Sequence, residues 1–261
     1  MRSLNIAATG MQAQQLNVDT ISHNLANMNT TGFKRHRAEF QDLIYQDLRR
    51  VGTNSSDVGT IVPTGVQVGL GVKTGAVSRA HEQGVATVTD NPLDVAIQGR
   101  GFFRIELPNG EFAYTRNGQF QLSPDGEIVT IDGYLVSPNI AVPEDAVSVA
   151  INGEGQVQAM IDGQVEPVDL GQLDMVTFIN PAGLDAMGQN LYLETPAAGD
   201  PIVGVPGDEG FGTVLQGFLE ASNVNPITEI TNMIVAQRAY EMNSKVITAS
   251  DEMLQSLNQS A

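Results

Sequence analysis

The chain contains no cysteine among its 261 residues, and this absence removes several kinds of chemistry. It excludes a disulfide framework, a thiolate nucleophile and a cysteine metal site. Tryptophan is also missing, and only three histidines are present. With 41% hydrophobic and 16% charged residues, the composition is that of a folded chain with few residues suited to catalysis.

Basic residues are missing from a long central stretch. No lysine or arginine occurs between Arg116 and Arg238, and this interval holds 17 of the 30 carboxylates. The rest of the chain has 13 acidic and 13 basic residues, so the interval carries the whole net charge of −17. Such a charge repels nucleic acid and anionic lipid. We expect the acidic surface to face outward from any assembly that the chain forms.

Long apolar runs are missing as well. No stretch approaches the ~20 apolar residues that a membrane-spanning helix needs. A cleaved signal peptide is not predicted, because Asn5, Thr9, Gly10 and Gln12 interrupt the apolar segment that such a peptide requires. A location outside the cytoplasm would therefore require export without a cleaved signal peptide.

Known catalytic motifs are not found. The Gly-rich segment 69–75 contains a Lys-Thr pair, but its spacing fits neither type of phosphate-binding loop. His23, His36 and His81 lack further ligands at metal-site spacing, and no serine lies in a GxSxG motif. The sequence therefore predicts no catalytic residue, no cofactor and no metal, which favours a protein that is not an enzyme.

The N-terminal segment repeats residues at the spacing of a coiled coil. Two sets lie seven residues apart: Leu4, Met11, Val18 and Leu25, and Ala7, Gln14, Ile21 and Met28. This a/d seam predicts a helix over residues 3–27 that packs on a partner helix. Gly32 is suited to the left-handed backbone that ends such a helix. The basic residues Lys34, Arg35 and Arg37 would then complement the helix dipole.

The C-terminal segment has a similar pattern. Its apolar seam consists of Met233, Tyr240, Ile247 and Leu254, with Leu257 in support. Asn225 is a good N-cap and Pro226 suits the first helical turn, where its missing N–H is not needed. We therefore predict a helix from 226 to about 257. We expect both terminal helices to become ordered only when copies of the chain interdigitate.

The middle of the chain is predicted to be β structure. Val66, Val68, Leu70 and Val72 alternate with small or polar residues, as in a half-buried strand. Six turn dipeptides predict hairpins, and the first four are spaced as in a meander: Asn109-Gly110, Asn117-Gly118, Asp125-Gly126, Asp132-Gly133, Asn152-Gly153 and Asp162-Gly163.

Together these patterns predict an α+β fold, in which long N- and C-terminal helices form a coiled-coil core and an all-β domain is inserted between them. The predicted boundaries are an N-terminal helical part at 1–35, an extended or helical connector at 36–72, an all-β outer domain at 73–222 and a C-terminal helix at 223–261. Helical seams at both ends of a chain favour assembly over catalysis.

Two long motifs resemble those of the bacterial flagellar rod and hook proteins. The first covers Ile21 to Lys34, and it contains Asn24, Leu25, Ala26, Asn27, Asn29, Thr31, Gly32, Phe33 and Lys34. The second begins near Leu219, and it contains Ser222, Asn223, Val224, Gln237, Arg238, Ala239 and Tyr240. The segments 91–103 and 114–118 are similar to the β core of the same family, and the opening residues 1–11 and the segment 45–73 are most similar to subunits of its distal rod.

This resemblance implies a structural subunit of a rigid tube that transmits torque from motor to hook. It implies copies of the chain as partners, together with proximal rod proteins, hook protein, the peptidoglycan and outer-membrane rings and the flagellar export apparatus. It also implies a location in the flagellar basal body across the periplasm. The seam residues of both helices would form the subunit interface.

Two alternatives remain open from the sequence. One is another axial subunit of the same family, from the proximal rod or similar to the hook. The other is a secreted β-rich hydrolase of cell-wall glycan, which would require two carboxylates about 5 to 9.5 Å apart in a cleft. The sequence shows no such pair.

Overall fold

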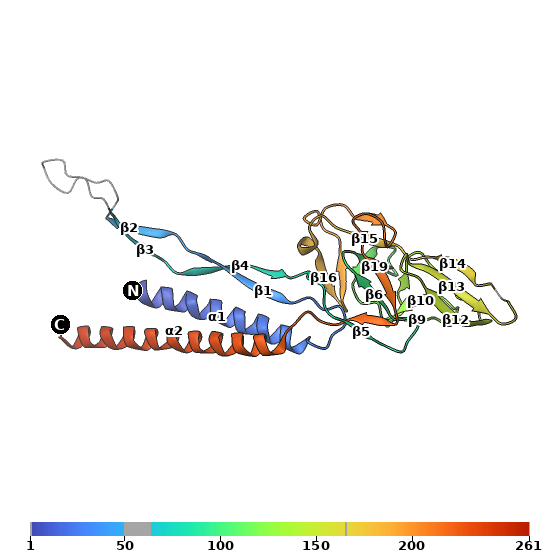
Figure 1. Cartoon of the computed structure of the whole chain (residues 1–261). Coiled ribbons are helices and arrows are strands. Elements are labelled where there is room, and N and C mark those ends of the chain that lie inside the picture. Colours follow the sequence, from blue (N-terminus) through green and yellow to red (C-terminus); the bar gives the residue numbers. More distant parts are fainter. Residues whose placement is uncertain (1, 50–63, 165, 261) are drawn as a thin grey trace. The chain divides into compact units, whose positions relative to one another are not determined.

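A computed structural model describes residues 2–49, 64–164 and 166–260 (Figure 1). The chain forms two compact units. The first, here called the helical unit, comprises residues 1–26, 36–78 and 225–261; the second, the β unit, comprises residues 27–35 and 79–224. Residues 50–63, which belong to the predicted connector at 36–72, lie outside the described residues.

Two helices dominate the helical unit. α1 spans Arg2–Ala26 and α2 spans Pro226–Ser260, close to the predicted limits. The Asn225 side chain accepts hydrogen bonds from the backbone N–H groups of Ile227 at 3.1 Å and Thr228 at 3.3 Å. Since these bonds satisfy two of the free N–H groups of the first turn, the predicted N-cap is confirmed. The two helices run side by side in opposite directions (Figure 1).

A two-stranded ribbon completes the helical unit. β1 (His36–Asp42) pairs with β4 (Val72–Arg79), and β2 (Tyr45–Arg49) pairs antiparallel with β3 (Val66–Gly69). Hydrogen bonds from Leu43 to Gly71 and from Leu70 to Ile44 join the two pairs. The alternating residues 66–72 therefore form two strands instead of one. Val66 and Leu70 are exposed and Val68 and Val72 are half-buried, because a two-stranded ribbon offers little surface on which to bury them.

A nine-stranded sheet forms the centre of the β unit. Seven strands follow the order β16 (Asp185–Gly188), β17 (Leu191–Leu193), β8 (Phe112–Thr115), β7 (Phe102–Glu106), β11 (Leu135–Val136), β10 (Ile128–Thr130) and β9 (Phe120–Leu122). β15 (Met175–Thr177) pairs with β7 and with β18 (Ile202–Gly204).

The smaller sheets of the β unit have two or three strands. One joins β12 (Ala146–Ile151), β13 (Gln156–Ile161) and β14 (Val168–Gln172). The others pair β6 (Val95–Gln98) with β19 (Thr213–Gln216), and β5 (Ala86–Val88) with β20 (Phe218–Glu220). A single 3-10 turn, η1, spans Pro181–Gly183.

The predicted meander is correct at three turns and wrong at one. Gly110, Gly126 and Gly133 have positive φ angles of 81°, 81° and 82°, and each lies between antiparallel neighbours in the predicted manner. At Asn117-Gly118 no hairpin forms, because Gly118 accepts a hydrogen bond from Val95 and β8 does not pair with β9. On the side opposite β8, β7 pairs with β11, so the sheet joins strands that are distant in sequence.

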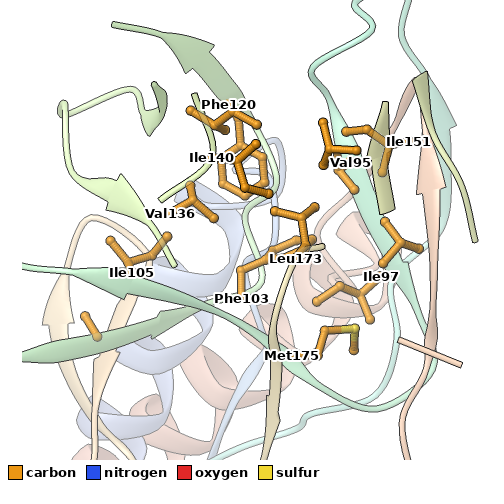
Figure 2. Packing of buried hydrophobic residues seen from close by; sticks show 14 of the residues in the cluster. Val95, Ile97, Phe103, Ile105, Phe120, Val136, Ile140, Ile151, Leu173 and Met175 are labelled. Atoms are coloured by element: carbon orange, nitrogen blue, oxygen red, sulfur yellow. The ribbon is translucent and has the colours of Figure 1, made fainter. Parts of the chain in front are cut away.

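Alternate residues of the central strands enter two different apolar clusters. Phe103, Ile105 and Met175 belong to the larger cluster, which Figure 2 shows with Phe120, Val136, Ile140 and Leu173. Their immediate neighbours Phe102 and Val176 point to the opposite face of the sheet, where they pack with Tyr114, Phe178 and Tyr192. This period of two buries both faces of β7 and β15.

The predicted fold class was wrong. The helices do not form a separate coiled-coil core with one all-β domain inserted between them, because the ribbon β1–β4 belongs to the helical unit and residues 27–35 belong to the β unit. Within one chain the contact between α1 and α2 is made mainly by small and polar residues, and of the predicted seam of α1 it buries Ala7 and Ile21. The chain is two helices at its ends with a large region of many strands between them.

Candidate assembly surface

The contact between α1 and α2 is made by small and polar residues. Ser3 and Ser250 are hydrogen-bonded at 3.3 Å, and Asn24 donates to Glu229 at 3.2 Å. Between these pairs, a Cβ atom added to Gly10 would lie 2.9 Å from the Asn243 side-chain nitrogen. On each helix the contacting positions are seven residues apart or a multiple of seven, so a heptad does face the partner helix.

The register of this heptad differs by one residue from the predicted seam of α1. Ser3, Gly10 and Asn24 directly precede Leu4, Met11 and Leu25. The most buried α1 residues are small or polar, apart from Ile21: Ala7, Ala13, Thr20, Ile21 and Asn24. On α2 the most buried are Glu229, Ala236 and Ser250. Small side chains allow the two backbones to approach closely, and they leave the larger residues at the edges of the contact.

The predicted interface residues are therefore only partly covered within one chain. Ile21 is buried, whereas Met28 and Tyr240 are 38% and 43% exposed. The remaining described members are half-buried: Leu4, Met11, Val18, Leu25, Met233, Ile247 and Leu254. The side chain of Leu257 lies outside the described part of the chain.

Apolar side chains are also exposed over much of the helical unit. On α2 they are Ile227, Ile230, Ile234, Val235, Tyr240, Met242, Val246 and Met253, with exposed fractions from 43% to 78%. The ribbon adds Ile44, Tyr45, Leu48, Val66 and Leu70. An exposed apolar surface of this extent on a folded chain marks a site of protein association. We call it the apolar surface of the helical unit.

In the first motif, Asn24 joins three elements of the helical unit. Its side chain accepts a hydrogen bond from the His36 backbone N–H and donates one to the His36 carbonyl, both at 2.8 Å. It also contacts Glu229 of α2, and both side chains are buried. Asn24 thus fixes the end of α1, the start of β1 and the first turn of α2.

The residues that follow α1 begin the β unit. Thr30 donates to Asn27, and Asn190 donates to the Thr31 carbonyl at 3.0 Å. Gly32 has a φ of +70°, as the sequence predicts, and its N–H donates to the Glu220 carbonyl. Phe33 is buried, whereas Ala26 and Asn29 are exposed.

The two motifs meet in a buried ionic cluster. Lys34 Nζ lies 2.6 Å from Glu220 Oε1, and Arg116 Nη2 lies 2.8 Å from Glu220 Oε2. These side chains are at most 5% exposed. Glu220 also accepts from the Gly84 N–H, and Lys34 donates to the Glu82 carbonyl. Burial, and to a smaller extent Arg116, lowers the pKa of Lys34 despite the attraction of Glu220.

Lys34, predicted to complement the helix dipole, is buried and forms an ion pair with Glu220. Sequence reasoning also missed Arg116 and Glu220, and the available signal was their position within segments that resemble the family. A buried lysine needs a partner, but nothing in the sequence says which of 30 carboxylates supplies it.

The second motif continues this structure on the C-terminal side. Asn223 accepts from the Arg35 N–H at 2.7 Å and donates to the carbonyls of Ala80 and Glu82. Ser222 accepts from the Val224 N–H, and Val224 is buried. Further along, Gln237, Arg238 and Tyr240 are exposed on α2, and Ala239 is half-buried.

His81 lies beside the ionic cluster. Its ring makes edge contacts with Phe102 and Tyr192, with centroids 6.0 Å and 6.3 Å away. Burial, together with the positive charges of Lys34, Arg79 and Arg116, lowers the pKa of His81 from 6.5 to about 4. The ring is therefore neutral near pH 7.

Neither helix of the described chain is both long enough and apolar enough to cross a membrane.

Within the described ranges, no group of three or more His, Asp or Glu side chains is placed to hold a metal ion.

Three family models match the chain. Residues 4–34 match the flagella basal body rod protein family, residues 96–159 the D1 domain of the flagellar hook protein FlgE/F/G, and residues 215–260 the C-terminal part of the flagellar basal body rod FlgEFG proteins. These regions include both motifs and most of β6–β13.

Full-length relatives agree with the family models. The flagellar basal-body rod protein FlgG of Caulobacter vibrioides is 57% identical over 259 residues, which is 99% of each chain. That of Agrobacterium fabrum is 53% identical and covers 97% of each chain. A solved structure, the flagellar hook protein FlgE2 of Helicobacter pylori, is 14% identical over 72% of this chain and 43% of its own, with a TM-score of 0.25.

The chain therefore belongs to the family of flagellar basal-body rod and hook proteins. Its similarity to FlgG proteins extends over nearly the whole chain, and this confirms the prediction of a structural subunit of the flagellar distal rod. The first motif, Ile21 to Lys34, and the C-terminal motif led to this prediction, and each contains residues whose hydrogen bonds or ion pairs stabilise the unit in which they lie.

Proposed function

We propose that copies of this chain assemble into a tubular rod through the apolar surface of the helical unit, and that the tube acts as a stiff drive shaft from motor to hook. The observation that supports this proposal is that different residues of the helices make the contact within one chain and form the exposed surface. Small residues make the contact within one chain, while most of the larger apolar residues of α1 and α2 stay half-buried or exposed. Those residues gain burial only from a neighbour.

The interface of this proposal includes the predicted seams. Leu4, Met11, Val18 and Leu25 on α1 and Met233, Tyr240, Ile247 and Leu254 on α2 contribute, as do Ile21, Met28 and Leu257. Covering one largely exposed Val or Met is worth about 1–2 kcal/mol. Since each subunit contributes many such residues to several neighbours, the assembled tube is far more stable than any single contact.

The ribbon of the helical unit would contribute to the stiffness of the assembled tube. Its apolar side chains, such as Ile44 and Leu48, are 80% and 58% exposed. If they pack between neighbouring subunits, they resist sliding of one subunit along another. A shaft built in this way transmits rotation without bending.

The remaining features of the proposal follow from the family. The partners are proximal rod proteins, hook protein, the surrounding ring proteins and the export apparatus, and the site is the basal body across the periplasm. The protein has no catalytic role and needs no cofactor.

The experiment places a charge on the apolar surface without disturbing the helix contact. Val235→Asp and Met242→Asp change residues that are 62% and 61% exposed, so the free chain should fold normally. We expect loss of rod assembly, measured by electron microscopy of isolated basal bodies, and loss of swimming. Asn232→Asp is the matched control, because it adds the same charge at an exposed polar position of α2.

Normal rods from both apolar variants would reject this surface as the interface. Circular dichroism of each purified variant shows whether α2 is intact, so that a folding defect is not mistaken for an assembly defect.

A further inference from the structure

The central sheet of the β unit ends in two free edges. Along the path β16–β17–β8–β7–β15–β18, each strand pairs antiparallel with the next. Phe103 of β7 lies opposite Thr115 of β8 on one side and Met175 of β15 on the other, so β16 and β18 are opposite ends of this path. Among the described residues, β18 pairs only with β15, and β16 only with β17. The outer backbone groups of both strands are therefore available for pairing.

Apolar side chains are exposed at both edges. Ile202 and Val203 of β18 are each 50% exposed, and Met187 of β16 is 57% exposed. Neither strand contains a lysine or a proline, although these residues commonly protect a free edge from pairing with another chain. An edge strand that is both apolar and unprotected is suited to accept a further strand.

The directions of the two edge strands match each other. Because strand direction alternates along the path, β18 runs opposite to β16. When a second copy continues the same sheet, its β16 lies beside β18 of the first copy and runs antiparallel to it, which is the commoner arrangement in sheets. An odd number of strands in the path would have given a parallel junction instead. The chain thus supplies a suitable partner strand for each of its own edges.

We propose that β18 of one copy pairs with β16 of a second copy, so that the central sheet continues from subunit to subunit. The proposal rests on the proposed function, because it assumes that copies meet in a rod. An antiparallel junction along the length of both strands brings Met187 to the apolar side chains of β18. Asp185 begins β16 and Asp200 precedes β18, so these two residues lie at opposite ends of the junction. The pairing therefore covers apolar side chains without bringing these carboxylates together.

This contact is head-to-tail, because it joins two different edges. Head-to-tail contacts generate rings or open helical assemblies, whereas a contact between two β18 strands would close a dimer. Neighbouring strands of a sheet are rotated by about 20–25° relative to each other, so successive subunits are also rotated, as a helical rod requires. The junction is a second contact between subunits, separate from the apolar surface of the helical unit.

The absence of cysteine permits a direct test. Val203→Cys and Met187→Cys each place a single thiol in the chain, on β18 and on β16. Rods are isolated from cells that make both variants and are treated with a short bismaleimide, which tolerates a small shift of register. We expect covalent dimers that contain one chain of each kind, and no dimer in rods built from either variant alone. Since the two thiols lie on separate chains, a link within one chain cannot produce this result.

Ile131→Cys is the matched control for Val203→Cys. It replaces an apolar residue of similar exposure, 54%, at the turn between β10 and β11 instead of at an edge strand. Combined with Met187→Cys, it should give no dimer.

Intact rods overturn the proposal if the mixed dimer is absent, if the control pair gives an equal yield, or if Val203→Cys alone forms dimers. Each of these results leaves the proposed function in place, because the charge substitutions Val235→Asp and Met242→Asp test it separately. If the cysteine variants form no rods, amide hydrogen exchange is measured on the unchanged protein. We expect peptides of both β16 and β18 to exchange more slowly in isolated rods than in the free chain. Exchange that slows in neither strand, or in only one of them, overturns the proposal.

Discussion

Lys34 and Glu220 form an ion pair of 2.6 Å although 186 positions separate them in the sequence. Lys34 ends the first motif of the family, and Glu220 lies at the start of the second. Both side chains are almost fully buried, and Arg116 binds the other oxygen of the same carboxylate. The β unit therefore depends on a contact between residues from opposite ends of the chain.

Replacing Glu220 with glutamine should destabilise the β unit strongly. The variant would leave Lys34 and Arg116 as two buried cations without a counterion, and breaking a buried ion pair in this way costs about 3–5 kcal/mol. Urea unfolding followed by tyrosine fluorescence would measure the loss. Glu106→Gln, at an exposed position of β7, should change stability very little; an equal effect of both variants would refute the role of the cluster.

His81 should make stability depend on pH between about 4 and 6.5. Its pKa is 6.5 in the unfolded chain and about 4 in the folded one. Across this window the unfolded state binds more protons, so stability falls as the pH is lowered from 6.5 to 4. Below about pH 4 the loss is complete and amounts to about 3 kcal/mol.

His81→Gln should remove this part of the pH dependence, because glutamine does not titrate. Unfolding midpoints measured at a series of pH values would show it, with His23→Gln at an exposed position of α1 as the control. The carboxylates add their own dependence at lower pH, so the test is the difference between the two variants. A difference that is constant from pH 7 to 4 would argue against a neutral, buried His81.

Asn24→Ala should loosen the end of the helical unit. The variant removes three hydrogen bonds, two to the His36 backbone and one to Glu229. We expect a loss of about 2–4 kcal/mol, visible in thermal unfolding of the helices by far-UV circular dichroism. Asn5→Ala, on an exposed position of the same helix, should be nearly neutral.

Gly10 tests the close approach of the two helices. Alanine normally stabilises a helix by about 1 kcal/mol relative to glycine. At this position the added Cβ would lie 2.9 Å from the Asn243 side chain, so Gly10→Ala should give no gain or a loss. Combined with Asn243→Ala, which removes the obstruction, it should become stabilising. If the two substitutions contribute additively in a double-mutant cycle, the two residues are not in contact.

Amide hydrogen exchange should show what assembly adds to the helices. Residues 2–26 and 226–260 pack on each other in one chain, but their larger apolar side chains stay partly exposed. We expect slow exchange only in assembled rods and faster exchange in the monomer, most clearly near the last turns of α2. Equal protection in both states would mean that the helices need no neighbour.

The sequence was most informative where a local rule decides the structure. Asn225 and Pro226 define the start of α2, and the turn glycines Gly110, Gly126 and Gly133 take the left-handed backbone that their dipeptides predict. Each of these depends on atoms a few residues away. The family resemblance was equally accessible, because long contiguous motifs carry it.

The sequence was least informative about pairs of distant residues. The apolar heptad of Leu4 and Met11 predicts contact with a partner helix from a neighbouring subunit, but it does not predict that the adjacent heptad of Ser3 and Gly10 contacts α2 within the chain. Periodicity shows that residues seven apart share one face of a helix, but it does not show which face contacts the partner helix. Small residues bury less apolar area than large ones, but they let the two backbones pack more closely. For the same reason the pairing of β7 with β11 and the partners of Lys34 could not be derived from spacing.

The ion pair between Lys34 and Glu220 also sets an order of events during synthesis. A ribosome makes Lys34 early, but its counterion follows only when about five-sixths of the chain exists. Until then the lysine must stay hydrated, because an unpaired charge is too costly to bury. The β unit therefore cannot complete its folding before Glu220 has been synthesised. The nascent chain stays incompletely folded until translation is nearly finished.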